Sequence, residues 1–263
     1  MERVVITGAG SGLGAALCEE LAKRGAKIVA ADIDLANAQR VAKRCGDRVH
    51  AVQCDVADLA AVQHLAGETE RLIGGVDFVV NNAGVAVVGQ VGEVPIEDWR
   101  WVIDVNVWGV IHGCHVFAPK LRAQKHGHIL NVASAAGLIA MPTMAPYNMT
   151  KAAVVALSET MYADLSSDGV GVSVLCPSFF PTNLTTSPRT STNEKLHRAA
   201  MRLVSQGGWT AEQVARAALE GAAAGTLHIA PQFDIKLSWR LKRLAPKAFQ
   251  RASKLAAKLM IRG

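Results

Sequence analysis

The chain has 263 residues, half of them apolar, and a formal net charge of +6. This length is enough for one α/β domain with a single large core. No stretch approaches the roughly 20 consecutive apolar residues of a membrane-spanning helix, which argues against a protein embedded in a membrane. The apolar run 4–6 follows residues 1–3 at once and leaves no room for a signal or transit peptide, so we expect a cytoplasmic protein.

Cysteine spacing and charge distribution narrow the class further. The five cysteines are scattered, so we expect reduced thiols, no disulfide framework and no metal site. The positive charge is confined to the C-terminus, because residues 236–262 carry nine Lys or Arg whereas residues 1–233 hold 19 basic and 21 acidic side chains. With no recognised nucleic-acid-binding module beside this charge, we expect no nucleic-acid partner.

Short Val- and Ile-rich runs alternate with longer segments of helical period, which is typical of a parallel sheet covered by helices on both faces. The sequence therefore predicts a single-domain, doubly wound, Rossmann-like α/β fold over residues 1–232. Residues 177–208 interrupt the alternation, with a short helix expected near 193–206, and lie where an insertion would cover a ligand as a substrate lid. The predicted strands are 3–7, 27–31, 48–54, 76–81, 127–133, 170–176 and 226–230, and the predicted helices are 13–24, 35–44, 58–73, 96–124, 146–166 and 210–224.

A glycine-rich segment joins the first predicted strand to the first predicted helix. Glycines in such a turn let backbone N–H groups approach a pyrophosphate at a helix N-terminus, where the helix dipole favours negative charge. Tight strand-to-helix turns also need glycine for steric reasons alone, so the turn by itself is a weak signal. The residues expected to contact a cofactor here are Thr7, Gly8, Ser11, Gly12, Leu13 and Gly14.

Asp32 closes the second predicted strand, 18 residues after Gly14. A carboxylate at this place can accept hydrogen bonds from the adenosine ribose hydroxyls. A 2′-phosphate would meet like charge there, and neither Ser11 nor Ile33 supplies a cation to offset it. The sequence therefore predicts NAD as the cofactor in preference to NADP, with a helix-capping or solvated aspartate as the structural alternative.

Tyr147 and Lys151 are four residues apart in a segment of helical pattern, so their side chains share one face. A tyrosine has an ordinary pKa near 10, and a nearby ammonium stabilises its phenolate and lowers that pKa toward neutrality. Such a pair is a candidate acid/base centre. The same spacing also occurs by chance in amphipathic helices, so the assignment of this pair depends on other residues of the same site.

Two further features support the assignment: Ser134 at the end of a predicted strand, and Asn81-Asn82-Ala83-Gly84 after the fourth strand. At these residues the sequence resembles the short-chain dehydrogenase/reductase family, in the branch whose chains are close to this one in length. The resemblance covers residues 1 to about 230. The TGxxxGxG turn matches Thr7, Gly8, Gly12 and Gly14, the acidic-apolar pair at the adenine matches Asp55 and Val56, the NNAG segment supplies Asn82, Ala83 and Gly84, and the catalytic residues match Asn106, Ser134, Tyr147 and Lys151.

The resemblance implies a role for each catalytic residue. Ser134 would hydrogen-bond the substrate oxygen, and Tyr147 would give or take the proton. Lys151 would hold the nicotinamide ribose and lower the pKa of Tyr147, while Asn106 would anchor a water that links Lys151 to solvent. The family's Pro-Gly after strand six is Pro177-Ser178 here, so the expected contacts of Pro177 and Thr182 with the cofactor depend on the local backbone path.

The segments expected to face substrate are 85–91, 135–144 and the stretch after Thr182. The first two are mostly apolar and contain no Lys or Arg, which favours a lipophilic alcohol or ketone such as a steroid, retinoid-like or fatty compound. Arg189 and Lys195 keep an anionic carbonyl substrate open as an alternative. A second alternative is a non-catalytic regulator that senses NAD. The family also implies a homodimer or homotetramer formed through helices 96–124 and 146–166.

Residues 233–263 form a basic tail that the resemblance does not explain. Pro246 could open an amphipathic helix with Phe249, Leu255 and Leu259 on one side and basic residues at spacings of three and four. This helix could lie on an anionic membrane as a peripheral contact, with Trp239 and Phe249 as interfacial anchors. Alternatively it docks on its own domain or on a second subunit.

Overall fold

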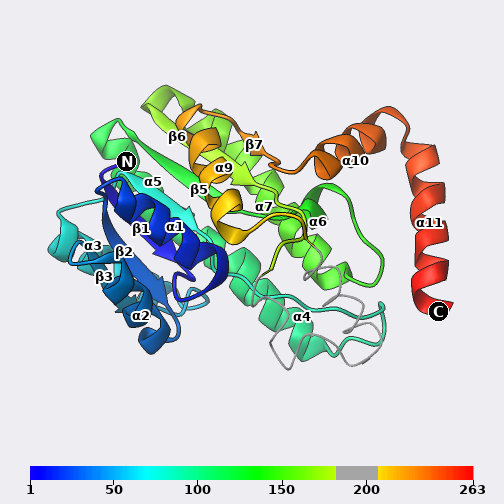
Figure 1. Cartoon of the computed structure of the whole chain (residues 1–263), viewed down its shortest axis with the longest axis horizontal. Helices are drawn as coiled ribbons and strands as arrows, with labels where there is room; N and C mark the ends of the chain where they lie inside the picture. The colour runs from blue at the N-terminus through cyan, green and yellow to red at the C-terminus, as the bar shows by residue number, and fades with distance from the viewer. Residues whose placement is uncertain (182–206, 263) are drawn as a thin grey trace.

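The computed structural model describes residues 1–181 and 207–262, the last four by their backbone alone. Seven parallel strands form one sheet in the order β3-β2-β1-β4-β5-β6-β7 (Figure 1). The expected short helix near 193–206, and most of the expected lid, lie outside the described residues. The strands are β1 (Arg3–Thr7), β2 (Lys27–Asp32), β3 (Val49–Gln53), β4 (Phe78–Asn81), β5 (Gly127–Val132), β6 (Val170–Leu175) and β7 (His228–Ile229).

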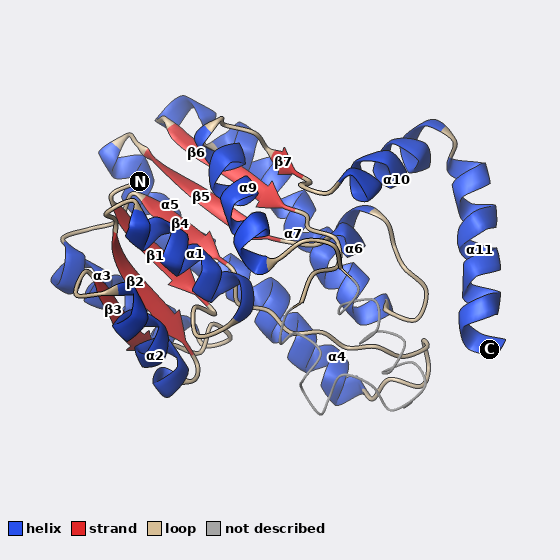
Figure 2. Cartoon of the chain, in the orientation of Figure 1, coloured by secondary structure: helices blue, strands red, loops and turns tan. Residues whose placement is uncertain are grey.

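Helices cover both faces of this sheet, because both faces of its strands are apolar (Figure 2). On β1, Val5 packs into one core cluster whereas Val4 and Ile6 pack into the other, as the alternation of side chains along a strand requires. The predicted doubly wound, Rossmann-like fold is confirmed. One face packs against α1 (Gly12–Lys23), α2 (Leu35–Cys45) and α9 (Ala211–Ala223), and the other against α3 (Leu59–Ile73), α5 (Gly109–Gln124) and α7 (Ala145–Asp164).

The strand order reverses between β1 and β4. From β1 the chain moves outward to β2 and β3, and then returns to place β4 on the other side of β1. The loops that leave the carboxyl ends of β1 and β4 therefore run to opposite sides and leave a crevice between them, which is where open α/β sheets bind ligands. Gly8 follows β1 at this edge, and Asn82 follows β4.

The helix expected over 96–124 is wrong in one respect, because a π-helical turn divides it. The structure has α4 (Ile96–Ile103), the π-helical turn η1 (Asp104–Trp108) and then α5. π-helical turns inside longer helices are rare and are frequent at functional sites. This turn contains Asn106, whose side chain is completely buried.

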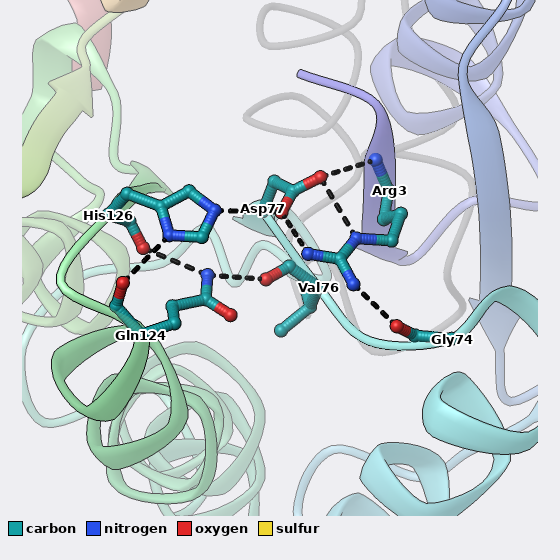
Figure 3. A network of polar contacts seen from close by, with 6 residues as sticks. All are labelled: Arg3, Gly74, Val76, Asp77, Gln124 and His126. Carbon is teal, nitrogen blue, oxygen red and sulfur yellow. Dashed lines mark hydrogen bonds and ion pairs between the residues drawn. The ribbon is translucent and has the colours of Figure 1, made fainter.

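At the opposite end of the sheet, an ion-pair network ties β1 to the segment that enters β4 (Figure 3). The Arg3 guanidinium donates to both carboxylate oxygens of Asp77, at 3.1 and 2.5 Å, and to the carbonyl of Gly74. His126 lies 3.5 Å from the same carboxylate, and Gln124 donates to the carbonyl of Val76 at 2.9 Å. Arg3 holds the pKa of Asp77 below its usual range through these hydrogen bonds. The network therefore stabilises the amino-terminal edge, away from the crevice.

Two helices end the chain, α10 (Phe233–Leu244) and α11 (Pro246–Arg262). Pro246 opens α11 as predicted, but α10 is not a tail, because Ile235 is buried in the core and Trp239 packs against it. Trp239 also lies 5.0 Å from the ring of His228, so it is unsuited to the membrane-anchor role considered for it. Figure 1 shows α11 at the edge of the molecule, attached through α10. None of the described helices is long and apolar enough to cross a membrane.

Candidate active site

The glycine-rich turn after β1 is locked to the loop after β4. The Asn82 side-chain amide donates to the carbonyls of Thr7 and Gly8 at 2.8 and 3.0 Å, while the hydroxyl of Thr7 accepts from the backbone N–H groups of Asn82 and Ala83. Gly8 has a φ of +63°, and a Cβ on Gly14 would strike the carbonyl of Gly8. The motif glycines are therefore needed for the close approach of the two loops.

α1 begins at Gly12, directly after this turn, with Ser11 as its N-cap. No acidic side chain occupies the first turn of α1, so its N-terminal dipole is not offset by a carboxylate of that turn. Asp32 lies beside it at the end of β2, where its carboxylate accepts from the backbone N–H groups of Gly10 and Asp34 at 2.8 and 3.0 Å. These bonds fix the carboxylate at the rim of the crevice.

A cavity of about 580 Å³ extends from this rim to the centre of the molecule. That volume is within the range of small-molecule and cofactor sites. Thr7 and Gly14 do not line it and instead hold the turn together, while Asn106 lies behind the wall and Thr182 is outside the described residues. Of the predicted site residues, those that line it are Gly8, Ser11, Gly12, Leu13, Asp32, Asp55, Val56, Asn82, Ala83, Gly84, Ser134, Tyr147, Lys151 and Pro177.

The far end of the cavity holds Ser134, Tyr147 and Lys151. Ser134 caps the short helix α6 (Ala135–Leu138), directly after β5, and a hydrogen bond links its side chain to that of Tyr147. The Lys151 ammonium lies 5.7 Å from the centre of the Tyr147 ring and donates to the carbonyl of Val132 at 2.9 Å. Helix α7 places both side chains on the face that points into the cavity, as their spacing predicts.

The pKa values of the pair differ from the expectation. Burial raises the pKa of Tyr147 to about 12, and the hydrogen bond with Ser134 opposes this only in part. Burial also lowers the pKa of Lys151 to about 8, so the ammonium is itself poorly stabilised. The expected lowering of the tyrosine pKa by Lys151 is therefore not seen among the chain's own residues, because desolvation by burial is the largest effect on the pKa of Tyr147. In this environment Tyr147 keeps its proton.

Asn106 fixes the loop that follows Gly84. Its side-chain oxygen accepts from the N–H of Val85 at 2.8 Å, and its side-chain nitrogen donates to the carbonyl of Val85 at 2.8 Å and to the hydroxyl of Thr150 at 3.1 Å. Thr150 donates in turn to the carbonyl of Tyr147. Both N–H groups of the amide are thus donated to protein partners, and its oxygen accepts one hydrogen bond from the protein.

Two apolar loops cover the substrate end of the cavity. The N–H of Gly89 donates to the carbonyl of Thr143 at 2.7 Å and joins them. Of the residues expected to face substrate, Val87 and Leu138 instead pack into the core. Those that line the cavity are Val85, Ala86, Val88, Ala135, Ala136, Ile139, Met141, Pro142, Thr143 and Met144, with Phe179 and Phe180 from the segment after β6.

The structure adds a wall that the sequence did not predict, formed by α10. Asp234, Ile235 and Ser238 line the cavity from this helix. Ser178, which replaces the glycine of the family pattern, ties the wall down, because its hydroxyl donates to the Asp234 carboxylate at 2.9 Å and its N–H donates to Gln232 at 3.0 Å. The only sequence signal for this was the departure at Ser178 itself.

Known proteins share this arrangement. The family model for short chain dehydrogenases matches residues 2–193. The chain belongs to the short-chain dehydrogenase family. A crystal structure of a short-chain dehydrogenase/reductase from Burkholderia phymatum in complex with NAD superposes with a TM-score of 0.88, at 38% identity over 94% of each chain. The resemblance found from the sequence motifs is thereby confirmed.

Among the relatives of this chain, the meso-2,3-butanediol dehydrogenase of Serratia marcescens is 39% identical over 183 residues, covering 69% of this chain and 72% of that protein. SadH of Mycobacterium tuberculosis is 39% identical over 175 residues, covering 65% of this chain and 63% of SadH. The chain therefore spans less than two thirds of the length of SadH. The matches to both relatives cover about two thirds of this chain, so they do not define its substrate.

Proposed function

We propose that the protein transfers a hydride between NAD(H) and the carbonyl or alcohol group of a lipophilic substrate. The observation that carries this proposal is one continuous cavity with a glycine turn and Asp32 at one end and Ser134, Tyr147 and Lys151 at the other. A Cβ on Gly8 would lie 2.7 Å from the backbone of Ala83, so glycine is needed at this position. The backbone of the turn is thereby left uncovered at Gly8, and it fits a dinucleotide whose pyrophosphate lies close to the backbone. The nicotinamide would supply the hydride.

The chain's own residues would bind the substrate oxygen and move the proton. Ser134 would donate a hydrogen bond to that oxygen, and Tyr147, which keeps its proton in this environment, would donate it as the carbonyl is reduced. Lys151 would orient the nicotinamide ribose through its ammonium. Asn106 acts as a positioning residue, since it holds the loop beside Gly84 and not the substrate itself.

The proposed preference is for NAD over NADP. Asp32 stands at the rim with both carboxylate oxygens already oriented by backbone N–H groups, so ribose hydroxyls can donate to it whereas a 2′-phosphate would be repelled. The ratio of kcat/KM for the two cofactors tests this. Equal or reversed values would contradict the assignment.

The proposed substrate is lipophilic. In the described part of the substrate end, the cavity is lined mainly by Val, Ile, Met and Phe, and its charged groups there are Lys151 and Asp234. Asp234 would repel an anionic carbonyl, which makes the anionic alternative the weaker one. A panel of steroid, retinoid-like and fatty carbonyl compounds set beside anionic carbonyl compounds tests the class, and activity confined to the anionic set would refute it.

Tyr147→Phe separates the enzyme from an NAD-sensing regulator. The substitution removes the hydroxyl and keeps the ring that packs against Ala86 and Ala136. We expect turnover to be lost while NAD binding, measured by calorimetry, stays near the wild-type value. Retained turnover would remove Tyr147 from the reaction, and absence of turnover with every substrate in the wild type, beside intact NAD binding, would favour the regulator.

We also propose a homo-oligomer in the cytoplasm. Trp108, Met149 and Tyr162 expose large apolar surface on η1 and α7, the elements through which the family resemblance predicts assembly. Sedimentation equilibrium of the wild type and of Tyr162→Glu would test this. A monomeric wild type would contradict it.

A further inference from the structure

The outer side of α10 carries an exposed apolar stripe. Phe233, Leu237, Leu241 and Leu244 are 75%, 46%, 49% and 84% exposed. Their spacing of four, four and three residues places them on one side of the helix. Four large exposed side chains in one row are unlike the scattered apolar residues of an ordinary protein surface, so the stripe marks an interaction surface.

The opposite side of the same helix faces the domain. Ile235 is buried in the core, Ser238 lines the cavity, and Lys242 donates to the carbonyl of Leu138 at 2.6 Å. These contacts fix the rotation of α10 about its axis. The apolar stripe therefore points outward because the helix is held by its other side.

Positive charge borders the stripe on α10 and continues onto α11. Lys236, Arg240 and Arg243 are exposed and lie along one edge of the stripe. α11 adds five more Lys or Arg and contains no Asp or Glu. The single acid of the two helices, Asp234, receives a hydrogen bond from Ser178 on the inner side. The lipid-docking surface, as we name it, consists of the apolar stripe of α10 and the basic edge beside it.

This combination selects among partners. A second copy of the chain docked face to face would bring two strongly basic surfaces together, which costs free energy. The phosphates of a nucleic acid would pair with the Lys and Arg side chains, but they would leave the row of Leu and Phe side chains without an apolar partner. A bilayer with anionic headgroups satisfies both, since apolar side chains enter the boundary between headgroups and acyl chains while Lys and Arg meet the phosphates.

We propose that the lipid-docking surface binds the anionic surface of a membrane, with α10 lying flat on it. Leu237 and Leu241 would enter the headgroup boundary, and Lys236 and Arg240 would contact lipid phosphates. The bilayer would then be separated from the cavity by the width of one helix, because Asp234, Ile235 and Ser238 line the cavity from the other side of α10. This inference does not depend on the proposed reaction.

Vesicle sedimentation with the full chain tests the proposal. We expect the protein to pellet with phosphatidylcholine vesicles that contain phosphatidylserine, to remain in solution with phosphatidylcholine alone, and to be released by high salt. Lys236→Gln/Arg240→Gln should weaken binding about 25-fold, at about five-fold for each cation brought to an anionic surface. The matched control Arg40→Gln/Lys43→Gln removes the same charge from exposed positions on α2 and should bind as the wild type does.

A second variant separates the apolar contribution. Leu237→Ser/Leu241→Ser should weaken binding at least tenfold at unchanged net charge, with the thermal unfolding midpoint as the check on folding. Binding equal to that of the wild type in both α10 variants would overturn the proposal, as would equal binding to both kinds of vesicle. A wild type that ignores vesicles but loses an oligomer in the Leu237→Ser/Leu241→Ser variant would show that the stripe is a subunit interface instead.

Discussion

Replacing Lys151 by Met should stabilise the folded chain near neutral pH while it removes turnover. Burial lowers the pKa of Lys151 from 10.5 to about 8, whereas in the unfolded chain the solvated amine keeps its ordinary value. The difference means that the buried ammonium costs about 3 kcal/mol at neutral pH. Loss of the hydrogen bond to Val132 offsets roughly 1–3 kcal/mol of the gain, so we expect the variant to be at least as stable as the wild type.

The dependence on pH is the sharper part of this prediction. A lysine with a lowered folded-state pKa binds fewer protons in the folded than in the unfolded state between about pH 8 and pH 10.5, so wild-type stability rises with pH over that window. Residue 151 does not titrate in Lys151→Met. Between about pH 7 and about pH 9.5 the unfolding free energy of the wild type should therefore rise by roughly 2 kcal/mol relative to that of the variant. Effects of the other titrating groups largely cancel between the two proteins.

Urea unfolding of both proteins at the two pH values, without nucleotide, measures this change. We expect the gap in unfolding free energy between variant and wild type to narrow, or to change sign, as the pH rises. A gap that stays constant would show that Lys151 keeps an ordinary pKa in the folded protein. Retained turnover in the variant would contradict the assignment of Lys151 to the reaction.

Three further predictions rest on named contacts. Asn106→Ala removes three hydrogen bonds of a buried amide and leaves their partners unpaired, so denaturant unfolding should show a loss of about 3–5 kcal/mol, and a loss below about 1 kcal/mol would mean that water replaces the amide. Arg3→Ala frees the Asp77 carboxylate, whose lowered pKa gives stability that is present above about pH 4 and lost as the pH falls through the folded-state pKa. The difference in thermal midpoint between Arg3→Ala and the wild type should therefore be large at neutral pH and shrink in acid, and a pH-independent difference would exclude the ion pair as its cause. Ser178→Gly removes the donor to Asp234 and loosens the α10 wall, so KM for the carbonyl substrate should rise severalfold with little change in stability, whereas an unchanged KM would show that the wall is held without this hydroxyl.

The fold was predictable because each strand is a short Val- or Ile-rich run that both core clusters bury. The break at 104–108 was not, because the segment has the apolar period of an ordinary helix. The π-helical turn accompanies tertiary bonds from Asn106 to Val85 and Thr150, which lie 21 and 44 residues away. Such bonds leave no local pattern in the sequence. The same holds for Asn82, whose amide is used on the glycine turn 74 and 75 residues away.

At the site, the spacing of Tyr147 and Lys151 predicted a shared face, and the family motifs supplied the partners that spacing could not. The pKa of Tyr147 was predicted in the wrong direction, since the sequence gives the neighbouring cation but not the depth of burial. The α10 wall was missed for a different reason. The apolar row of α10, Phe233 to Leu244, faces away from the cavity, whereas its inner side includes Asp234 and Ser238.

The α10 wall also sets an order of events during synthesis. All seven strands precede α10 along the chain, and domains are made from the N-terminus onward at roughly 5–20 residues per second. The sheet, the glycine turn and Tyr147 therefore leave the ribosome before the helix that closes one side of their cavity. A chain that ended before Phe233 would therefore carry the residues of the nucleotide crevice without those that α10 adds to the substrate end of the cavity.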